Sequence, residues 1–176
     1  MTAKKRVSTN TVPHASFSLI PWASFAFGSL LFGSVGSIFT APAIPHWYRL
    51  LLKPPFNPPN WIFGPVWTIL FLLMGTSAYL IYQQQKHQFR KHLASTHALT
   101  IYVLQFGFNM LWSFLFFGVN NLFLSVINIM ILWGLILLMI YTFYKISKTA
   151  AYLLIPYLLW VSFASYLNIW IYFFNR

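Results

Sequence analysis

One segment of the chain carries two amides and a tryptophan at helical spacing. Gln105, Asn109 and Trp112 are four and three residues apart, so they share one face of a helix. Amides are costly against lipid, and this face is therefore expected to point inward. There they would either contact a ligand or join neighbouring helices, and the residues alone do not decide between these roles.

Two further segments place aromatic residues on matching stripes. Trp160, Ala164 and Asn168 follow one another at intervals of four, and Trp67 lies one turn past Phe63. Three helices thus each offer an aromatic side chain on an inward stripe. Such stripes supply stacking surface for a flat apolar ligand. The same pattern is also typical of an ordinary core.

The residue types that are missing exclude several chemistries. The 176 residues contain no Asp, Glu or Cys, and Lys plus Arg number 11. Paired-carboxylate catalysis, carboxylate-bound Mg²⁺ or Ca²⁺, acidic proton relays and thiolate chemistry are therefore excluded. His87, His92 and His97 recur every five residues, whereas helical metal pairs need three or four. No metal site is expected.

The elements that must position these side chains are long apolar runs. The chain is 59% hydrophobic and 21% aromatic, with a mean hydropathy of +0.69. About 20 apolar residues span a bilayer. Five runs free of charged residues reach that length: Trp22–Ala41, Trp61–Gln83, Ala98–Gly118, Leu122–Tyr144 and Ala150–Phe174. The sequence predicts an all-α integral membrane protein, a five-transmembrane-helix bundle forming one domain over 21–176, preceded by a polar basic arm over 1–20.

Small residues follow one face of the first run. Ser29, Gly33 and Ser37 are spaced by four, which lets another helix approach closely. That helix belongs either to the same bundle or to a second copy of the chain. The run is expected to stay as a helix rather than be cleaved as a signal peptide, because its basic residues lie far from it and it is too long.

Positive charge is unequally shared between the two ends of such a bundle. Five spans put eight basic residues on the side of the N-terminus and three on the other. The eight are Lys4, Lys5, Arg6, Lys86, Arg90, Lys91, Lys145 and Lys148, and the three are Arg49, Lys53 and Arg176. Positive-inside topology predicts a cytoplasmic N-terminus. The charge fits lipid head groups, and no nucleic-acid partner is expected.

The connection over 42–60 is unusually stiff and aromatic. Lys53–Trp67 reads KPPFNPPNWIFGPVW, and its paired prolines fix an extended backbone. Asn60 is expected to cap the next helix. Trp47, Phe56 and Trp61 are expected to bury against helix ends. The stretch is thus either an ordered cap over a pocket or an anchor at the membrane interface.

Three longer stretches carry a family resemblance. They are WYRLLLKPPFNPPNWIFGPVWTILFLLMG, ALTIYVLQFGFNMLWSFLFFG and AAYLLIPYLLWVSFASYLN, within residues 47–175. The first and third are specific in their combination and spacing. The chain resembles the bacterial-type members of the TspO/MBR family, the translocator proteins or peripheral-type benzodiazepine receptors.

The resemblance implies a lipophilic pocket under the first loop of a five-helix bundle, often in a homodimer. Family members bind tetrapyrroles such as protoporphyrin and haem, as ligands rather than required cofactors, and other lipophilic molecules. The ligand-binding positions it implies are Tyr48, Pro58, Phe63, Trp67, Asn109, Trp112, Trp160 and Ala164. A bacterial cell membrane, with membrane lipid as a further partner, is the implied location.

The chain departs from the family pattern at one position and matches a weaker pattern elsewhere. Asn128 stands where the family usually has an acidic residue. Leu167, Tyr172 and Arg176 form a sterol-type pattern, which is equally an interfacial anchor.

Three functions follow from the resemblance. The first is a membrane receptor for tetrapyrroles and other lipophiles, with a role in porphyrin homeostasis or stress signalling. The second is light- and oxygen-dependent porphyrin degradation that uses Trp67 and Trp160, the only enzymatic activity expected. The third is a porphyrin transporter. Against transport stand the uncharged spans and the lack of an internal repeat.

Overall fold

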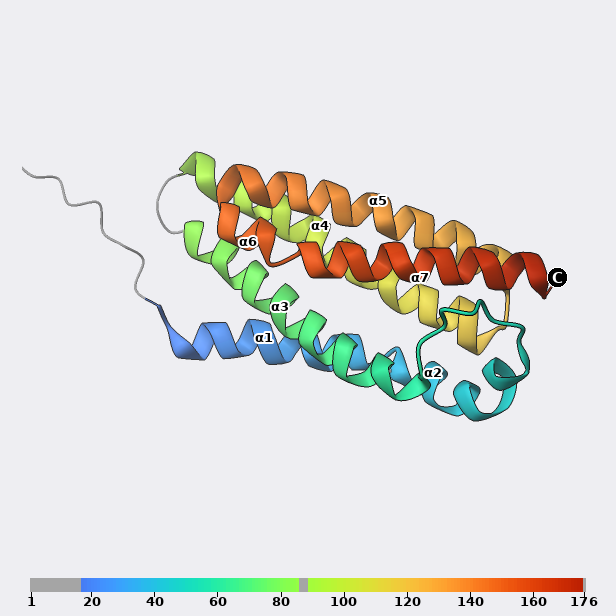
Figure 1. Ribbon diagram of the computed structural model, residues 1–176. Helices are drawn as coiled ribbons and strands as arrows, with labels where there is room; N and C mark the ends of the chain where they lie inside the picture. Colours follow the sequence, from blue (N-terminus) through green and yellow to red (C-terminus); the bar gives the residue numbers. More distant parts are fainter. Residues whose placement is uncertain (1–16, 86–88, 176) are drawn as a thin grey trace, which may run out of the picture.

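The computed structural model describes the backbone of residues 17–85 and 89–175. This part of the chain forms a bundle of helices that run lengthwise beside one another (Figure 1). The α-helices are α1 (Leu19–Ser34), α2 (Ser37–Ala43), α3 (Phe63–Gln84), α4 (Phe89–Ser113), α5 (Leu122–Ile146), α6 (Lys148–Tyr152) and α7 (Ile155–Phe174). Shorter helical turns are η1 (Ile44–Tyr48), η2 (Asn60–Ile62) and η3 (Phe114–Gly118). Most of the expected arm over 1–20 lies outside the described residues.

The predicted set of membrane spans is confirmed, with one break in the first. Four helical stretches in the described residues are long and apolar enough to cross a bilayer, over Asn60–Gln84, His92–Gly118, Leu122–Ile146 and Lys148–Phe174. The pair Leu19–Ser34 and Ser37–Tyr48, bent by 43°, passes the same test when taken together, which gives up to five spans. The protein is therefore an all-α, multi-pass membrane protein.

Two connections are shorter than expected, because helix continues into them. The predicted loop over 42–60 is wrong in its first half, since α2 and η1 carry the chain helically to Tyr48. The polar stretch before the third run is largely helical, because α4 begins at Phe89. Asn60 does not cap a helix through its side chain and instead begins η2.

The last span is also broken. The helix α6 ends at Tyr152, and α7 begins at Ile155. Pro156 is thus in the first turn of α7, where its missing N–H needs no helical acceptor.

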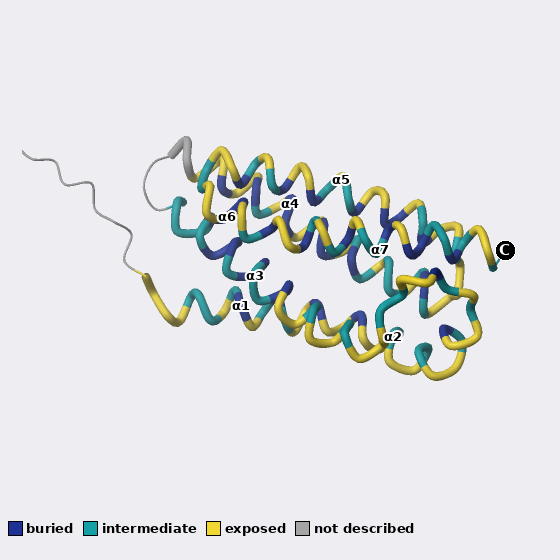
Figure 2. Tube along the Cα trace, viewed as in Figure 1, coloured by how far each residue is buried: buried dark blue, intermediate teal, exposed yellow. Residues whose placement is uncertain are grey.

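The helices pack through faces that are dark blue in Figure 2 and look toward the bundle interior. Ala26, Ser29 and Gly33 are the buried residues of α1. The Ser29 hydroxyl pairs with Tyr102 of α4, and Phe71 of α3 occupies the space beside Gly33. These two small residues therefore contact helices of the same chain, which decides the alternative left open for them by the sequence.

The closest helix contact lies between α1 and α3. A Cβ atom on Gly75 would stand 2.6 Å from the Ala26 Cα and closer still to the Phe25 carbonyl oxygen. Both are backbone atoms, so the helices would have to separate to admit a methyl group.

We expect Gly75→Ala to lower the free energy of unfolding by about 1–3 kcal/mol, the usual penalty for overpacking. Gly28→Ala is the matched control, because no atom lies within 4 Å of its Cβ position in the same helix pair. There the change should be neutral or slightly stabilising, since alanine is the better helix former. Thermal unfolding of both variants in the same detergent measures the difference, and equal midpoints would contradict the close contact.

Candidate functional site

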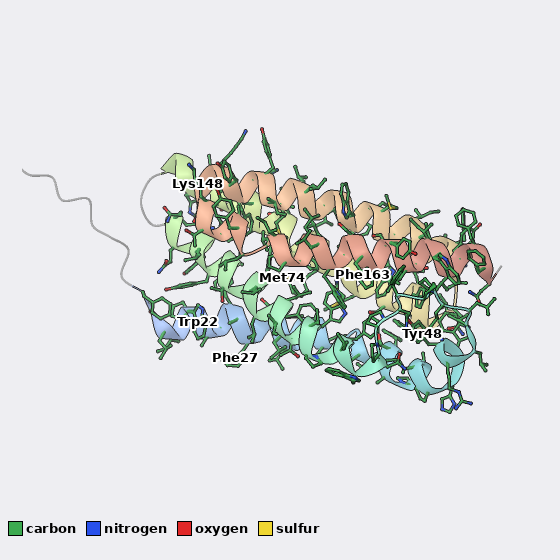
Figure 3. The ribbon with its side chains drawn as sticks, in the orientation of Figure 1. Trp22, Phe27, Tyr48, Met74, Lys148 and Phe163 are labelled. Carbon is green, nitrogen blue, oxygen red and sulfur yellow. The ribbon has the colours of Figure 1, made fainter. Side chains whose placement is uncertain are left out.

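A cavity of about 350 Å³ lies at the end of the bundle where the 51–59 loop connects η1 to η2. Its walls come from α1 and α2, the first turns of α3, the end of α4 with η3, and α7. Tyr48 marks this end in Figure 3, near the C-terminus of α7. The volume lies within the range of sites for small molecules.

The structure brings together seven of the eight positions named from the family resemblance. Those lining the cavity are Tyr48, Phe63, Trp67, Asn109, Trp112, Trp160 and Ala164. Pro58 is the exception. It lies in the loop, and its carbonyl oxygen accepts a hydrogen bond from Asn57 Nδ2 (3.1 Å).

Two tryptophans reach the cavity from α3 and α7. Trp67 stacks on Phe71, with ring centroids 5.2 Å apart, and meets the ring of Tyr157 edge-on at 6.2 Å. Trp160 meets Phe63 edge-on at 5.8 Å. Neither indole N–H has a hydrogen-bond partner among the described residues. Both rings are therefore held by packing and keep a free donor.

The third tryptophan belongs to a chain of hydrogen bonds. Trp112 stacks on Phe116 (5.4 Å) and its Nε1 donates to Asn168 Oδ1 (2.8 Å). Asn168 Nδ2 donates in turn to the Ser125 hydroxyl (3.0 Å). Trp112 and Asn168 line the cavity, and this chain links them to Ser125, joining α4, α7 and α5 and fixing the plane of the Trp112 ring.

The predicted inward face of α4 is confirmed by a second polar cluster. Asn109 Nδ2 donates to the Tyr157 hydroxyl (3.1 Å), which donates to Gln105 Oε1 (2.9 Å). All three residues are buried. Asn109 therefore faces the cavity with its amide nitrogen already engaged, and its carbonyl oxygen is the atom left to accept a bond from a ligand. Gln105 Nε2 is buried without a partner among the described residues.

The 51–59 loop is tied down at both of its ends. The Tyr48 hydroxyl donates to Asn57 Oδ1 (2.8 Å), and the Asn57 backbone N–H donates to the Pro54 carbonyl (3.0 Å). Asn175 holds Leu52 through two bonds, donating from Nδ2 to its carbonyl (3.0 Å) and accepting at Oδ1 from its N–H (2.8 Å). The loop is thus held to the end of the bundle, although none of its residues lines the cavity. Whether it caps the pocket or anchors the membrane interface stays a prediction.

The aromatic residues of this region behave differently from one another. Trp47 packs edge-on against Phe116 (5.4 Å). Phe56 and Trp61 are 76% and 72% exposed, so the expectation that they bury against helix ends is wrong. These two side chains pack little against the rest of the described chain, and their exposure fits contact with the membrane interface.

Basic side chains lie near the cavity without lining it. Lys53 Nζ donates to the Leu51 carbonyl (3.0 Å) and lies over the Tyr48 ring, 4.8 Å from its centroid. Partial burial lowers the pKa of the Lys53 ammonium group. Arg49 is exposed. The cavity itself is therefore apolar, with amides and hydroxyls as its polar groups.

The remaining residues singled out by the sequence lie elsewhere. Asn128 Nδ2 donates to the Phe108 carbonyl (2.9 Å), and its Oδ1 is buried with no partner among the described residues. Leu167 lines the cavity, whereas Tyr172 packs beside Phe123 of α5 (5.9 Å). Arg176 lies outside the described residues. The two described members of the sterol-type pattern thus face different surroundings.

No group of His, Cys, Asp or Glu in the described part of the chain is placed to hold a metal ion. His92 and His97 lie in α4, and His87 lies outside the described residues.

Sequence reasoning missed two parts of the site. One is the wall from α1 and α2, built of small residues such as Ser34, Ser37 and Ala41. Small residues at helical spacing can be recognised in this part of the sequence. The spacing alone does not show whether they contact a helix or line a cavity. The other is the pair of asparagines that tie the loop, Asn57 and Asn175, whose partners are set only by the fold.

These features define a multi-pass helical membrane protein with an aromatic cavity at one end. The sequence pattern of the TspO/MBR family matches residues 25–173, and the chain belongs to that family. It is 40% identical to the tryptophan-rich protein TspO of Chlorobaculum tepidum over 79% of this chain and 85% of that protein. It is 40% identical to the tryptophan-rich protein TspO of Archaeoglobus fulgidus, over 83% and 91% of the two chains. The translocator protein of Bos taurus is 31% identical over 89% of this chain and 86% of its own.

Proposed function

We propose that the protein is a membrane receptor that binds flat lipophilic molecules, tetrapyrroles first among them, in the cavity beneath the 51–59 loop. The observation that carries this proposal is the convergence of three tryptophans, Trp67, Trp112 and Trp160, on one cavity of about 350 Å³. Rings held from several helices supply large stacking area with little loss of side-chain freedom on binding.

The polar groups suit a ligand whose charge lies at its edge. Asn109 offers an acceptor, while Trp67 and Trp160 offer free indole donors. The chain has no acidic residue, and no basic residue lines the cavity. The propionates of a tetrapyrrole would therefore point toward the end of the bundle that carries Arg49 and Lys53.

Titration of protoporphyrin into the protein in lipid nanodiscs tests the proposal. We expect a saturable shift of the porphyrin absorbance band with one site per chain, measured against empty nanodiscs. A shift that grows linearly with porphyrin and equals that of empty discs would contradict it.

The convergence of Trp67 and Trp160 also favours a second activity, porphyrin degradation in light. Two oxidisable indoles with free N–H groups would lie against the macrocycle, and molecular oxygen would be the co-reactant. Illumination of the complex in air should then remove porphyrin absorbance faster than in the dark or under argon. If both tryptophans can be replaced without changing that rate, the activity does not belong to this site.

The orientation in the membrane is a further part of the proposal. Lys145 and Lys148 lie at the end of the bundle where α1 begins, with their ammonium groups 4.1 Å and 5.7 Å from the ring centroids of Tyr141 and Tyr144. The basic side chains assigned to this end outnumber those at the other by eight to three. The N-terminus is proposed to be cytoplasmic, in a bacterial cell membrane.

Reporter fusions at residue 1 and after Arg176 check this orientation. We expect a cytoplasmic signal from the first and an external signal from the second, because five spans place the termini on opposite sides. Two signals from the same side would contradict the span count, and two inverted signals would contradict the charge argument.

A homodimer within membrane lipid completes the proposal. Its interface is expected to avoid Ser29 and Gly33, since both are buried against other helices of the same chain.

A further inference from the structure

We propose that ligands reach the cavity sideways from the bilayer, through an opening between α2 and the first turns of α3, and not past the 51–59 loop. The opening is called the side portal below. This inference rests on the proposed function in taking the cavity as the binding site, and its test is designed to be independent of any natural ligand.

The exposure of the cavity wall locates the side portal. Most lining residues are buried or half-buried, and those contributed by α4, η3 and α7 are all in these two classes. The exposed lining residues come from the other side: Ser34, Ser37, Ala41, Asn60, Gly64 and Thr68. A residue that lines a cavity and is also exposed lies at an opening. The cavity therefore opens between the bent first span and the beginning of α3.

The side chains around the side portal are small. None of the exposed lining residues is larger than asparagine, and Gly64 has no atom within 4 Å of its Cβ position. The side of Gly64 where a side chain would project is thus empty space. The first carbon of a side chain at this position would therefore meet no neighbouring atom.

The break in the first span explains why the opening lies beside α2 and not beside α1. Before the break, α1 packs closely against α3. The Phe71 ring lies against Gly33 of α1, and the α1 backbone lies against Gly75 of α3. The axis then bends by 43°, and Gly36 packs so closely on α4 that a Cβ would lie 2.9 Å from the Ser113 hydroxyl. Beyond the break, α2 packs mainly against η3 and α4 instead of α3. The wall between α2 and α3 is then left to small side chains.

The hydroxyls of the side portal are already satisfied. Ser34 donates to the Leu31 carbonyl (2.8 Å), Ser37 to the Ser34 carbonyl and Thr68 to the Gly64 carbonyl (2.9 Å). The Ser34 and Thr68 bonds are made within their own helices, and the Ser37 bond spans the break between α1 and α2, so each hydroxyl already has a local backbone acceptor. A rim of this kind suits transfer from lipid better than from water.

The loop route is closed by contrast. Movement of the 51–59 loop would break the Tyr48–Asn57 bond and both bonds between Asn175 and Leu52. It would also expose Pro54, which is buried. The structure therefore gives one route that is open and one that needs several contacts to break.

The absence of cysteine from the chain permits a direct test. Ala164→Cys places a single thiol on the cavity wall of the full-length protein in lipid nanodiscs. We compare its labelling rate with a bilayer-soluble maleimide, N-phenylmaleimide, and with a charged maleimide confined to water. Each labelling rate is divided by the rate of the same reagent with a small free thiol. The corrected rate should be higher for the bilayer-soluble reagent than for the charged one.

Four further substitutions on this background separate the routes. Gly64→Phe obstructs the side portal, and Ser37→Phe obstructs it from the opposite edge. Each should slow labelling by N-phenylmaleimide about tenfold or more. Gly134→Phe is the matched control, because Gly134 of α5 also has an empty Cβ environment but lies outside the cavity lining. Asn175→Ala loosens the loop and should leave the N-phenylmaleimide rate unchanged.

Two results would overturn the side portal. One is an unchanged rate in both Gly64→Phe and Ser37→Phe, and the other is a large acceleration by Asn175→Ala, which would assign access to the loop. Because no tetrapyrrole is present, these outcomes do not depend on the proposed function. If protoporphyrin does bind, Gly64→Phe should slow its association with the cavity.

Discussion

Replacement of Trp67 and Trp160 together by leucine is expected to weaken protoporphyrin binding by about 30-fold or more. Loss of one aromatic stacking surface costs about 1–3 kcal/mol, by analogy with the stacking of nucleic-acid bases. Two such losses that add give at least about 2 kcal/mol, which corresponds to that factor. The two rings reach the cavity from α3 and α7 and do not stack on each other, so their effects should be close to additive.

The control for this experiment is Trp61→Leu. Trp61 is close to Trp67 in sequence but is 72% exposed and does not line the cavity. Affinity should be read from the porphyrin absorbance band, because tryptophan fluorescence changes when tryptophans are removed. If the double variant folds and binds as tightly as Trp61→Leu, the tryptophans of this cavity are not the binding surface.

The spans and inward faces could be predicted because both depend on local patterns. A bilayer requires about 20 apolar residues, and the runs show this directly. The inward faces of α4 and α7 follow from the cost of amides in lipid, as Asn109 and Asn168 show by their burial. The cavity lining was predictable only through the family resemblance, since the same stripes would suit an ordinary core.

The break in the first span could not be predicted from its own residues. No proline lies at Val35 or Gly36, where the chain bends. The bend accompanies close packing of Gly36 on Ser113, a residue 77 positions away. A small residue in the sequence shows that close approach is possible, but not which partner will approach.

The 51–59 loop likewise depends on both local residues and residues far away in the sequence. Paired prolines indicate a stiff segment, and the segment is ordered. Its attachment, however, depends on Asn175, which is 123 residues from Leu52. The prediction that Phe56 and Trp61 are buried was wrong. In a membrane protein an aromatic side chain can contact lipid instead of other side chains of the protein.

Asn168→Ala is expected to destabilise the protein by about 2–4 kcal/mol and to weaken ligand binding at the same time. The side chain is 1% exposed and accepts the Trp112 indole N–H while donating to Ser125. Its removal leaves a buried donor without an acceptor, which costs about 1–3 kcal/mol, and adds a cavity term of about 1 kcal/mol. The Trp112 ring also loses the bond that fixes its plane at the cavity wall.

Ser162→Ala provides a matched control for this substitution. Ser162 accepts the indole N–H of Trp133 (2.8 Å), so both variants delete the acceptor of a tryptophan by truncation to alanine. Ser162 is exposed on α7, whereas Asn168 is buried and lines the cavity. Thermal unfolding and porphyrin titration of the two variants should therefore separate, with Ser162→Ala close to the parent in both. Equal effects would show that the hydrogen-bond chain from Trp112 to Ser125 does not organise the cavity wall.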